Sequence, residues 1–276
     1  MPKLLVQLSD THIRLPGQLA YGRVDTSAFL AQAVASVLAL PQAPVAVLVT
    51  GDLTDYGSAG EYAHLRALLA PLACPVYLLP GNHDDRAALR RAFPEHGWMR
   101  QSGDDFLQYA VDLGGLRLVV LDTSVTKAPQ GELDTAHLDW LDAALAEDRT
   151  TPTLVAMHHP PFATFVGHMD EIGLQRGGRE FGAVIARHPQ VERIVCGHLH
   201  RSIQTRFAGT IAMTAPSTAH AVTLDFAADA PVEFAMEPPG YLVHAWSETG
   251  QVVSHLVFSS GYDGPFSFRD GTAASH

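Results

Sequence analysis

The stretch LLVQLSDTH (residues 4–12) places an apolar, strand-like run directly before two side chains that can bind a metal, Asp10 and His12. Four further stretches repeat this arrangement: AVLVTGDLTD (46–55), VYLLPGNHD (76–84), TLVAMHHPP (153–161) and RIVCGHLH (193–200). They add the candidate ligands Asp52, Asn82, His83, His158, His159, His198 and His200. A buried strand holds the residue at its end rigidly at the edge of a sheet, so five strands can bring several ligands to one point. The pattern predicts a site for two metal ions.

Composition favours a folded domain with a small partner. The 276 residues are 47% apolar and 17% charged, which suits one large domain, or a domain with a modest appendage, and argues against global disorder. The net charge of −11 argues against nucleic acid, because binding its phosphates needs a basic surface. A small phosphate ester stays possible, since bound dications can reverse the local field.

Location and cysteine chemistry give two further expectations. The chain passes from Met1 directly into a strand-like run, and no stretch approaches the roughly 18 apolar residues of a membrane span. We therefore expect a cytoplasmic protein without a membrane partner. Cys74 and Cys196 lie in or beside apolar runs and are expected to be buried free thiols. A thiolate ligand at Cys196 would need its side chain to leave the core face.

Strand-like and helix-like segments alternate over most of the chain, which predicts an α/β layered protein. A Gly114-Gly115 pair between two apolar runs predicts a hairpin over 108–121, so the sheets are expected to be mixed. Ser58 and Glu61 have the spacing of a capping box at a helix start. Helices are expected at 27–40, 58–69, 86–92, 135–145 and 178–187, and strands at 4–8, 45–49, 76–79, 154–157 and 191–195.

After His200 the pattern changes to short strands, expected at 203–207, 210–214, 221–226, 241–246 and 252–258. We interpret residues 1–220 as a catalytic domain and residues 221–276 as a small C-terminal β extension and tail. The extension is expected to pack on the same domain or to form a contact in a homo-oligomer, a dimer or higher.

The spacing of the ligands suggests how they meet. Asp10 and His12 are two residues apart, as are His198 and His200, so on an extended chain each pair would project to one side. A glycine before each of Asp52, Asn82 and His198 permits a tight turn. Three nearby carboxylates, Asp55, Asp84 and Asp85, are expected to be helix caps or solvated loop groups rather than ligands.

In this order, the motifs resemble the calcineurin-like metallophosphoesterases, a family that includes purple acid phosphatases and Ser/Thr protein phosphatases. The resemblance covers about residues 3–220. It is strongest to the branch of class III cyclic nucleotide phosphodiesterases and bacterial glycerophosphodiesterases, through GNHDD (81–85), AMHHPPF (156–162), Met169-Asp170 and CGHLH (196–200). It implies a four-layer α-β-β-α sandwich, in which helices flank two mixed sheets.

The resemblance also implies a ligand set. One metal would take Asp10, His12 and His200, the other Asn82, His158 and His198, and Asp52 would bridge them. His158 is chosen over His159 because the family pattern is a ligand histidine, one variable residue and proline. Neighbours on a strand also point oppositely, so His159 is expected to be a supporting or rim group that can contact substrate.

Other histidines receive roles by the same resemblance or by position. His83 would face the substrate and stabilise or protonate the leaving oxygen, with Asn82 beside it. His220 looks like a further substrate-binding histidine, and His168 is a possible rim residue. The remaining ones are expected to be structural: His64, His96, His137, His188, His244, His255 and His276.

These residues imply a phosphodiesterase that acts on a cyclic nucleotide or a glycerophosphodiester. Two divalent ions clamp the attacking and leaving oxygens, and a hydroxide held between them near Asp52 would attack phosphorus. Ligands of Asp, Asn and His suit Mn, Fe, Zn or Co. A phosphomonoesterase, nucleotide pyrophosphatase or protein phosphatase could use the same centre. A non-catalytic metal-binding module is disfavoured, because every expected ligand is present.

Overall fold

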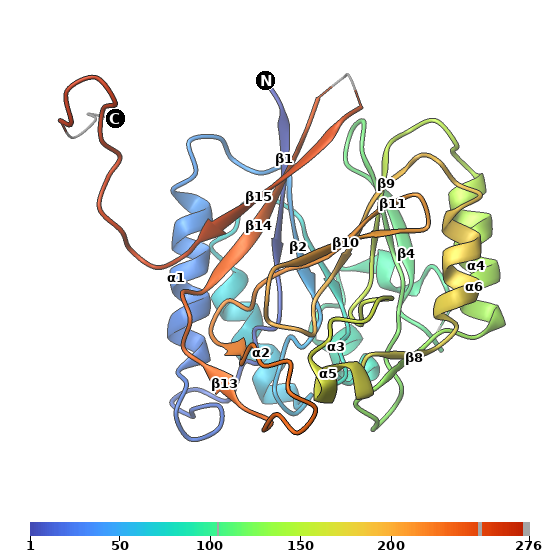
Figure 1. Cartoon of the computed structure of the whole chain (residues 1–276), viewed down its shortest axis with the longest axis horizontal. Coiled ribbons are helices and arrows are strands. Elements are labelled where there is room, and N and C mark those ends of the chain that lie inside the picture. Colours follow the sequence, from blue (N-terminus) through green and yellow to red (C-terminus); the bar gives the residue numbers. More distant parts are fainter. Residues whose placement is uncertain (104, 248–249, 273–276) are drawn as a thin grey trace.

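Two β-sheets packed face to face, with helices on the outer sides, make up the computed structural model, which describes residues 1–103, 105–247 and 250–272 (Figure 1). The first sheet has the order β15 (Val252–Phe258), β14 (Gly240–Trp246), β1 (Lys3–Leu8), β2 (Ala46–Thr50) and β3 (Val76–Leu79). The second has the order β10 (Ile203–Phe207), β11 (Thr210–Thr214), β9 (Val191–Cys196), β7 (Thr153–Ala156), β5 (Arg117–Val120) and β4 (Tyr109–Asp112). Both sheets are mixed, and β1, β2, β3, β7 and β9 have parallel neighbours.

Helices complete the four layers that the sequence predicts. α1 (Thr26–Leu38) and α2 (Ala59–Leu69) lie on one outer side, and α4 (Thr135–Ala146) and α6 (Gly178–Ile185) on the other (Figure 1). The short helices are α3 (Arg86–Ala92), the 3-10 helix η1 (Gly97–Arg100) and α5 (Gly167–Glu171). The expected capping box starts α2: Ser58 accepts a hydrogen bond from the Glu61 backbone, and Glu61 reaches back to Ser58.

Alternation along the strands builds two cores. In β5 and just after it, Leu118 and Val120 belong to the core that contains the inner strands, whereas Val119 and Leu121 pack with α4 and α6. This period of two is the one expected for strands buried on both faces. With both faces covered, the strand ends are held rigidly, which is the condition that a site at those ends requires.

The C-terminal strands are part of the first sheet. β14 pairs antiparallel with β1 on one side and with β15 on the other. Tyr241 is fully buried, and its hydroxyl is 3.0 Å from Ser36 Oγ of α1. The segment that we expected to be an extension therefore packs on the main body. The expected strand over 221–226 is shorter, because only β12 (Ala221–Val222) forms, paired with β13 (Phe234–Ala235). β6 (Gly131–Glu132) and β8 (Leu174–Arg176) make another small pair.

Two smaller expectations have mixed outcomes. Both cysteines are free thiols, but only Cys196 is buried and Cys74 is partly exposed. Among the described residues, no helix combines the length and apolar character that crossing a membrane requires.

Candidate metal centre

The loops that follow β1, β2, β3, β7 and β9 carry the candidate ligands. They do so on an unusual backbone: φ is positive at Asp10 (51°), His12 (42°), Asp52 (47°), His198 (71°) and His200 (53°). The expectation of an extended chain through these residues is therefore wrong, since β1 already ends at Leu8. Left-handed conformations are uncommon for residues other than glycine, although Asp and His adopt them more often than most, and they cluster at functional sites where surrounding structure enforces them.

One group of ligand atoms surrounds His12 Nε2. The His12 Nε2 atom lies 3.1 Å from His200 Nε2 and 3.6 Å from Asp52 Oδ2. Asp10 Oδ1 is 3.6 Å from His200 Nε2. All four side chains are buried. Two imidazole nitrogens and two carboxylate oxygens thus face one small volume.

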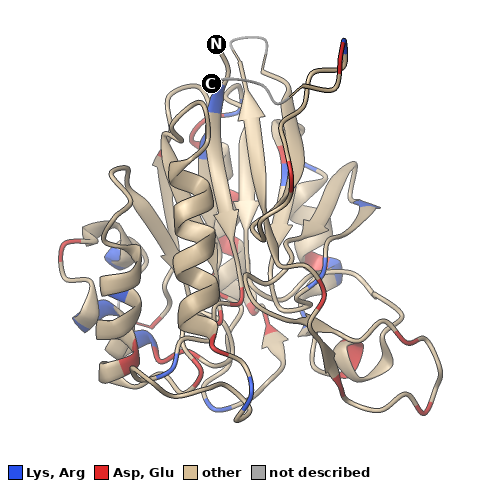
Figure 2. Ribbon diagram, turned by 90° about the vertical axis from the view of Figure 1, so that its left-hand side faces the viewer, with Lys and Arg blue, Asp and Glu red and all other residues tan. Residues whose placement is uncertain are grey.

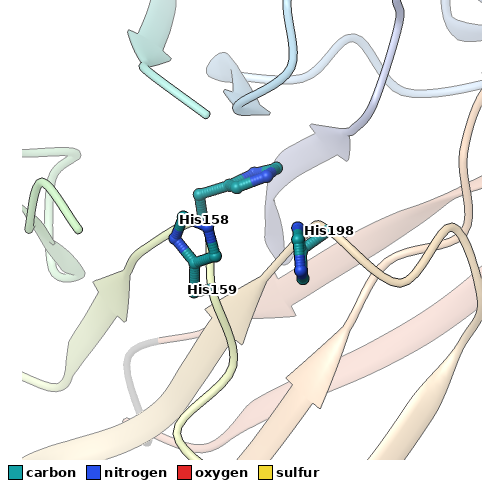
Figure 3. Close-up of side chains that lie close together, drawn as sticks. All are labelled: His158, His159 and His198. Atoms are coloured by element: carbon teal, nitrogen blue, oxygen red, sulfur yellow. The ribbon is translucent and has the colours of Figure 1, made fainter. Parts of the chain in front are cut away.

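A second group shares Asp52. The same oxygen, Oδ2, lies 3.4 Å from His158 Nε2, which is 3.2 Å from Asn82 Oδ1. The ring of His198 lies beside that of His158, with centroids 5.1 Å apart (Figure 3). Asp52 is therefore the carboxylate common to both groups, as a bridging ligand must be.

The residues present fit metal ions. Metal–nitrogen and metal–oxygen bonds of about 2.1 Å place neighbouring ligand atoms roughly 3 to 3.5 Å apart, which is the spacing seen around Asp52. His198 Nε2 is buried and has no hydrogen-bond partner, a costly arrangement unless a ligand binds there. His158 Nδ1 and His200 Nδ1 lie 2.8 and 3.2 Å from backbone carbonyl oxygens, which leaves each Nε2 free.

Burial keeps two of these imidazoles neutral. Burial, with His158 nearby, lowers the pKa of His198 to about 3. Burial, with His220 nearby, holds the pKa of His200 well below its ordinary value. The neutral imidazole is the form that binds a metal, so both side chains are ready as ligands.

His158 and Asp52 behave as a pair. Burial would lower the pKa of His158, but the Asp52 carboxylate outweighs it and raises that pKa to about 9. Burial would raise the pKa of Asp52, but His158 and His83 hold it well below its ordinary value. A negative carboxylate thus attracts positive charge at this point, and a dication there would replace the proton that His158 holds.

Two glycines allow the loops that carry Asp52, Asn82 and His158 to approach one another closely. At Gly51, φ is +87°, and a Cβ would overlap His158 Nδ1. A Cβ at Gly81 would overlap both Asp52 Oδ1 and the Asp52 backbone nitrogen. The expected role in a tight turn describes Gly51, whereas Gly81 is needed for space.

Two carboxylates that we expected to be caps or solvated groups support the loops of the centre instead: Asp55 is buried and Asp84 is partly buried. Asp84 accepts hydrogen bonds from the backbone N–H groups of Leu53 (3.0 Å) and Gly81 (2.9 Å) and from the Tyr62 hydroxyl (2.8 Å). It therefore joins the loop that carries Asp52 to the loop that carries Asn82. The local pattern offered no means of separating it from Asp85, which does cap α3.

Asp55 is the second of these supports, 7% exposed. Its Oδ1 lies 3.4 Å from His12 Nδ1, and its backbone carbonyl accepts a hydrogen bond of 2.9 Å from His83 Nδ1. His83 is also tied to Asp52, since its backbone N–H donates to Asp52 Oδ1 at 3.0 Å. His83 therefore stands beside the ligands in a fixed orientation.

His159 lies behind the centre. Figure 3 shows it next to His158 and His198, and its ring centroid is 4.6 Å from that of His198. Its Nδ1 is 2.8 Å from Thr123 Oγ1 and its Nε2 is 3.1 Å from the Pro129 carbonyl oxygen. It is fully buried and does not line the cavity described below, so the expected contact with substrate is not supported and a supporting role fits.

Most of the remaining histidines bond to protein groups away from the centre. His137 completes the cap of α4 with Asp134, His188 binds Asp142, and His64 Nδ1 is 2.8 Å from the Arg14 carbonyl oxygen. His244 binds Gln7 and Ser254. His276 lies outside the described residues.

A cavity of about 510 Å³ opens over the centre. Its base includes His12, Asp52 and His198, and the expected substrate-side residues Asn82, His83, His168 and His220 also line it. Met169 and Ile172 also line it, within the stretch 162–179 where the sequence predicts part of the pocket rim, and Val222 lies close to His220, the other predicted part. Sequence reasoning missed the other residues of the wall: Tyr21, Val232, Glu233 and Phe234. None of these follows a strand pattern of the kind that marked the ligands.

Comparison with known proteins agrees with this architecture. Residues 4–202 match the calcineurin-like phosphoesterase family. The chain is 34% identical to a probable glycerophosphodiester phosphodiesterase GpdQ of Arcobacter nitrofigilis, over 96% of each chain. It is 36% identical to a probable cyclic nucleotide phosphodiesterase of Rhodopseudomonas palustris, over 97% of each.

Among solved structures, a dimetal phosphatase from Danio rerio has a TM-score of 0.64 at 17% identity and covers 94% of this chain and 100% of its own. A purple acid phosphatase from yellow lupin has a TM-score of 0.65 at 15% identity, covering 99% of this chain and 53% of its own. These two support the fold alone. Taken with the family match and the two relatives, they lead to one conclusion: the chain belongs to the calcineurin-like phosphoesterase family.

Proposed function

We propose that this protein hydrolyses a small phosphodiester, a glycerophosphodiester or a cyclic nucleotide, at a centre for two divalent metals. Asp10, His12 and His200 would hold one metal, and Asn82, His158 and His198 the other. The observation that carries the proposal is Asp52 Oδ2, which lies within 3.6 Å of His12 Nε2 and within 3.4 Å of His158 Nε2. The names of the two relatives support the class of substrate.

The chain's own residues supply binding and proton transfer. When bound, two metals would activate water and offset charge on the phosphoryl oxygens. His83 Nδ1 is engaged by the Asp55 carbonyl, which leaves Nε2 available to the cavity. A protonated His83 can therefore donate from Nε2 to the leaving oxygen. Asn82 and His220, both at the cavity, would orient the phosphate ester.

The identity of the metals and the setting of the enzyme are part of the proposal. The donor set of carboxylate, amide and imidazole without thiolate suits Mn, Fe, Zn or Co. Lys and Arg are dispersed among Asp and Glu on the ribbon (Figure 2), which supports a small substrate over a nucleic acid. We place the enzyme in the cytoplasm, as expected from the sequence, and keep a homo-oligomer as a prediction.

Metal content and turnover of two variants test the proposal. Asp52→Ala removes the shared ligand and should abolish binding of two metals per chain, with a loss of at least about 10³-fold in kcat/KM. His83→Ala should keep both metals and slow turnover by about 10²-fold or more, most for poor leaving groups. The role of His83 fails if its variant loses metal as readily as Asp52→Ala.

A substrate panel separates the alternatives. With added Mn²⁺, wild-type protein should hydrolyse an aryl phosphodiester and either glycerophosphodiesters or cyclic nucleotides faster than monoesters. Preference for monoesters, nucleotide pyrophosphates or phosphoproteins would point to the other phosphatase classes. Fewer than one metal per chain together with no turnover would point to a non-catalytic module.

A further inference from the structure

Tyr21 stands at the tip of a tight turn beside the cavity. Ala20 and Val24 exchange two backbone hydrogen bonds of 2.9 Å, and φ is positive at both Tyr21 (52°) and Gly22 (65°). Ala20 and Val24 thus form an isolated antiparallel bridge that closes a three-residue turn, which a further hydrogen bond of 3.0 Å from the Arg23 backbone N–H to the Ala20 carbonyl tightens. Although Tyr21 is 53% exposed, the turn beneath it is anchored, because Ala20 and Val24 are buried against Ala219.

Three rings from distant parts of the chain meet at this point. The Tyr21 ring lies 5.2 Å from that of Phe234 and 5.3 Å from that of His220. The His220 and Phe234 rings are also 5.2 Å apart. All three residues line the cavity over the metal centre, and we call them the aromatic wall. Phe234 is held in place because β13 pairs with β12.

The aromatic wall is uncharged at its outer end. Burial, together with the carboxylates of Asp55 and Asp52, raises the pKa of Tyr21, so its hydroxyl stays protonated at neutral pH. The wall continues into apolar side chains of the same cavity, Val222 and Val232. A phosphate on the metal centre would therefore have a flat, largely apolar surface beside it, in which Glu233 is the charged side chain.

The two candidate substrate classes differ in what they offer to such a surface. A glycerophosphodiester carries short hydroxylated chains, which have no flat face. A nucleobase presents a π-face, and stacking of a base on an aromatic side chain strengthens binding by about 5- to 150-fold. A cavity of about 510 Å³ has room for a molecule of nucleotide size beside the bound phosphate.

We propose that Tyr21 and Phe234 determine specificity by stacking on the base of a nucleoside cyclic phosphate, and so favour this class over glycerophosphodiesters. The inference rests on the proposed function, because it assumes phosphodiester hydrolysis at the centre. It gives the two residues a role in binding and none in the chemical step.

The test compares kcat/KM for 3′,5′-cyclic AMP and for glycerophosphocholine in variants with equal metal content. Tyr21→Ala should lower kcat/KM for cyclic AMP by about 5- to 150-fold, mainly through KM, and change that for glycerophosphocholine by less than about twofold. Tyr21→Phe keeps the ring and should behave as wild type for both. Phe234→Ala should follow Tyr21→Ala.

Phe226→Ala is the matched control, because Phe226 lies on the same β12–β13 connection, is 64% exposed and does not line the cavity. Binding of adenosine, which has no phosphate, should weaken in Tyr21→Ala and remain unchanged in Phe226→Ala. If wild type hydrolyses both diesters and Tyr21→Ala leaves the ratio of the two kcat/KM values unchanged, or if wild type hydrolyses glycerophosphocholine alone, the aromatic wall does not select cyclic nucleotides while the proposed function stands. Hydrolysis of neither diester overturns both.

Discussion

The metal centre and the rim of the cavity are built in opposite ways. The candidate ligands follow buried strands: Asp10 and His158 are fully buried, and His198 is 3% exposed. The rim comes from turns and short segments, and it leaves Tyr21 53% and Val232 79% exposed. The sheets thus hold the candidate ligands, whereas local turns hold the rim, which would contact the variable part of a substrate. We therefore expect substitutions that displace the candidate ligands to stop activity, and substitutions in the cavity rim to change substrate selectivity.

The largest effect should come from filling the space at Gly81. Gly81→Ala would place a Cβ against Asp52 Oδ1 and the Asp52 backbone, and neither can move without displacing the shared ligand. We expect loss of at least one metal per chain and a fall in kcat/KM of more than about 100-fold, measured by metal analysis and initial rates.

Gly97→Ala provides the control for this prediction. A Cβ at Gly97 meets nothing within 4 Å, so this variant should bind two metals and turn over normally. If Gly81→Ala keeps both metals and full activity, the centre tolerates movement of Asp52, and the sheets do not hold the ligands as rigidly as we infer.

Sequence patterns predicted the metal centre but missed much of the wall of the cavity, and the reason is physical. Asp10, Asp52 and His158 each follow an apolar run, so local pattern identified them as residues at strand ends, and the order of the motifs implied that they meet. The contact between Tyr21 and Phe234 joins segments more than 200 residues apart, and no local pattern reports it. The left-handed backbone at Asp10 was equally hidden, since surrounding structure and not residue type enforces it.

The same reasoning explains two other misses. Asp84 and Asp85 are neighbours of one residue type, but only their place in the fold makes one a link between two loops and the other a helix cap. The position of β14 next to β1 depends on pairing between the two ends of the chain. Local periodicity predicts that a strand exists but does not predict its neighbour.

Asp84 offers a milder way to loosen the centre. Asp84→Asn keeps the size of the side chain but replaces an acceptor oxygen with a donor. Either the backbone N–H groups of Leu53 and Gly81, which share Oδ2, or the backbone N–H of Thr54, on Oδ1, then lose their partner. We expect metal affinity to fall by about 10- to 100-fold, as for other groups that orient ligands, while kcat at saturating metal is largely kept. Titration in metal buffers measures this.

Tyr62→Phe should have a smaller effect, since Asp84 loses one hydrogen bond and keeps its charge and its bonds to Leu53 and Gly81, although the Asp85 backbone N–H also loses the Tyr62 hydroxyl as acceptor. Its metal affinity should lie between wild type and Asp84→Asn. Equal affinity in all three proteins would show that the link between the two loops does not position Asp52 and Asn82.

The smallest expected effect concerns support behind the centre. His244 Nε2 is 3.0 Å from Gln7 Oε1, and Gln7 in turn donates to Cys196 of the second sheet. Burial, with Arg193 nearby, lowers the pKa of His244 from 6.5 to about 3. The folded protein therefore keeps this imidazole neutral, while the unfolded chain takes up a proton below about pH 6.5.

The contribution of neutral His244 to the free energy of unfolding is fully present above about pH 6.5 and is lost as the pH falls toward 3. Between pH 7 and pH 5 the loss should be about 2 kcal/mol, from about 1.4 kcal/mol per pH unit over the last 1.5 units. His244→Gln can still donate to Gln7 but does not titrate, so its free energy of unfolding should fall by about 2 kcal/mol less than that of wild type. Urea unfolding of equally metal-loaded proteins at both pH values measures the difference, in which other titrating groups cancel. If the free energy of unfolding of wild type and His244→Gln falls equally between pH 7 and pH 5, His244 takes up a proton in the folded protein. The polar network behind the centre would then be less rigid than the ligands in front of it.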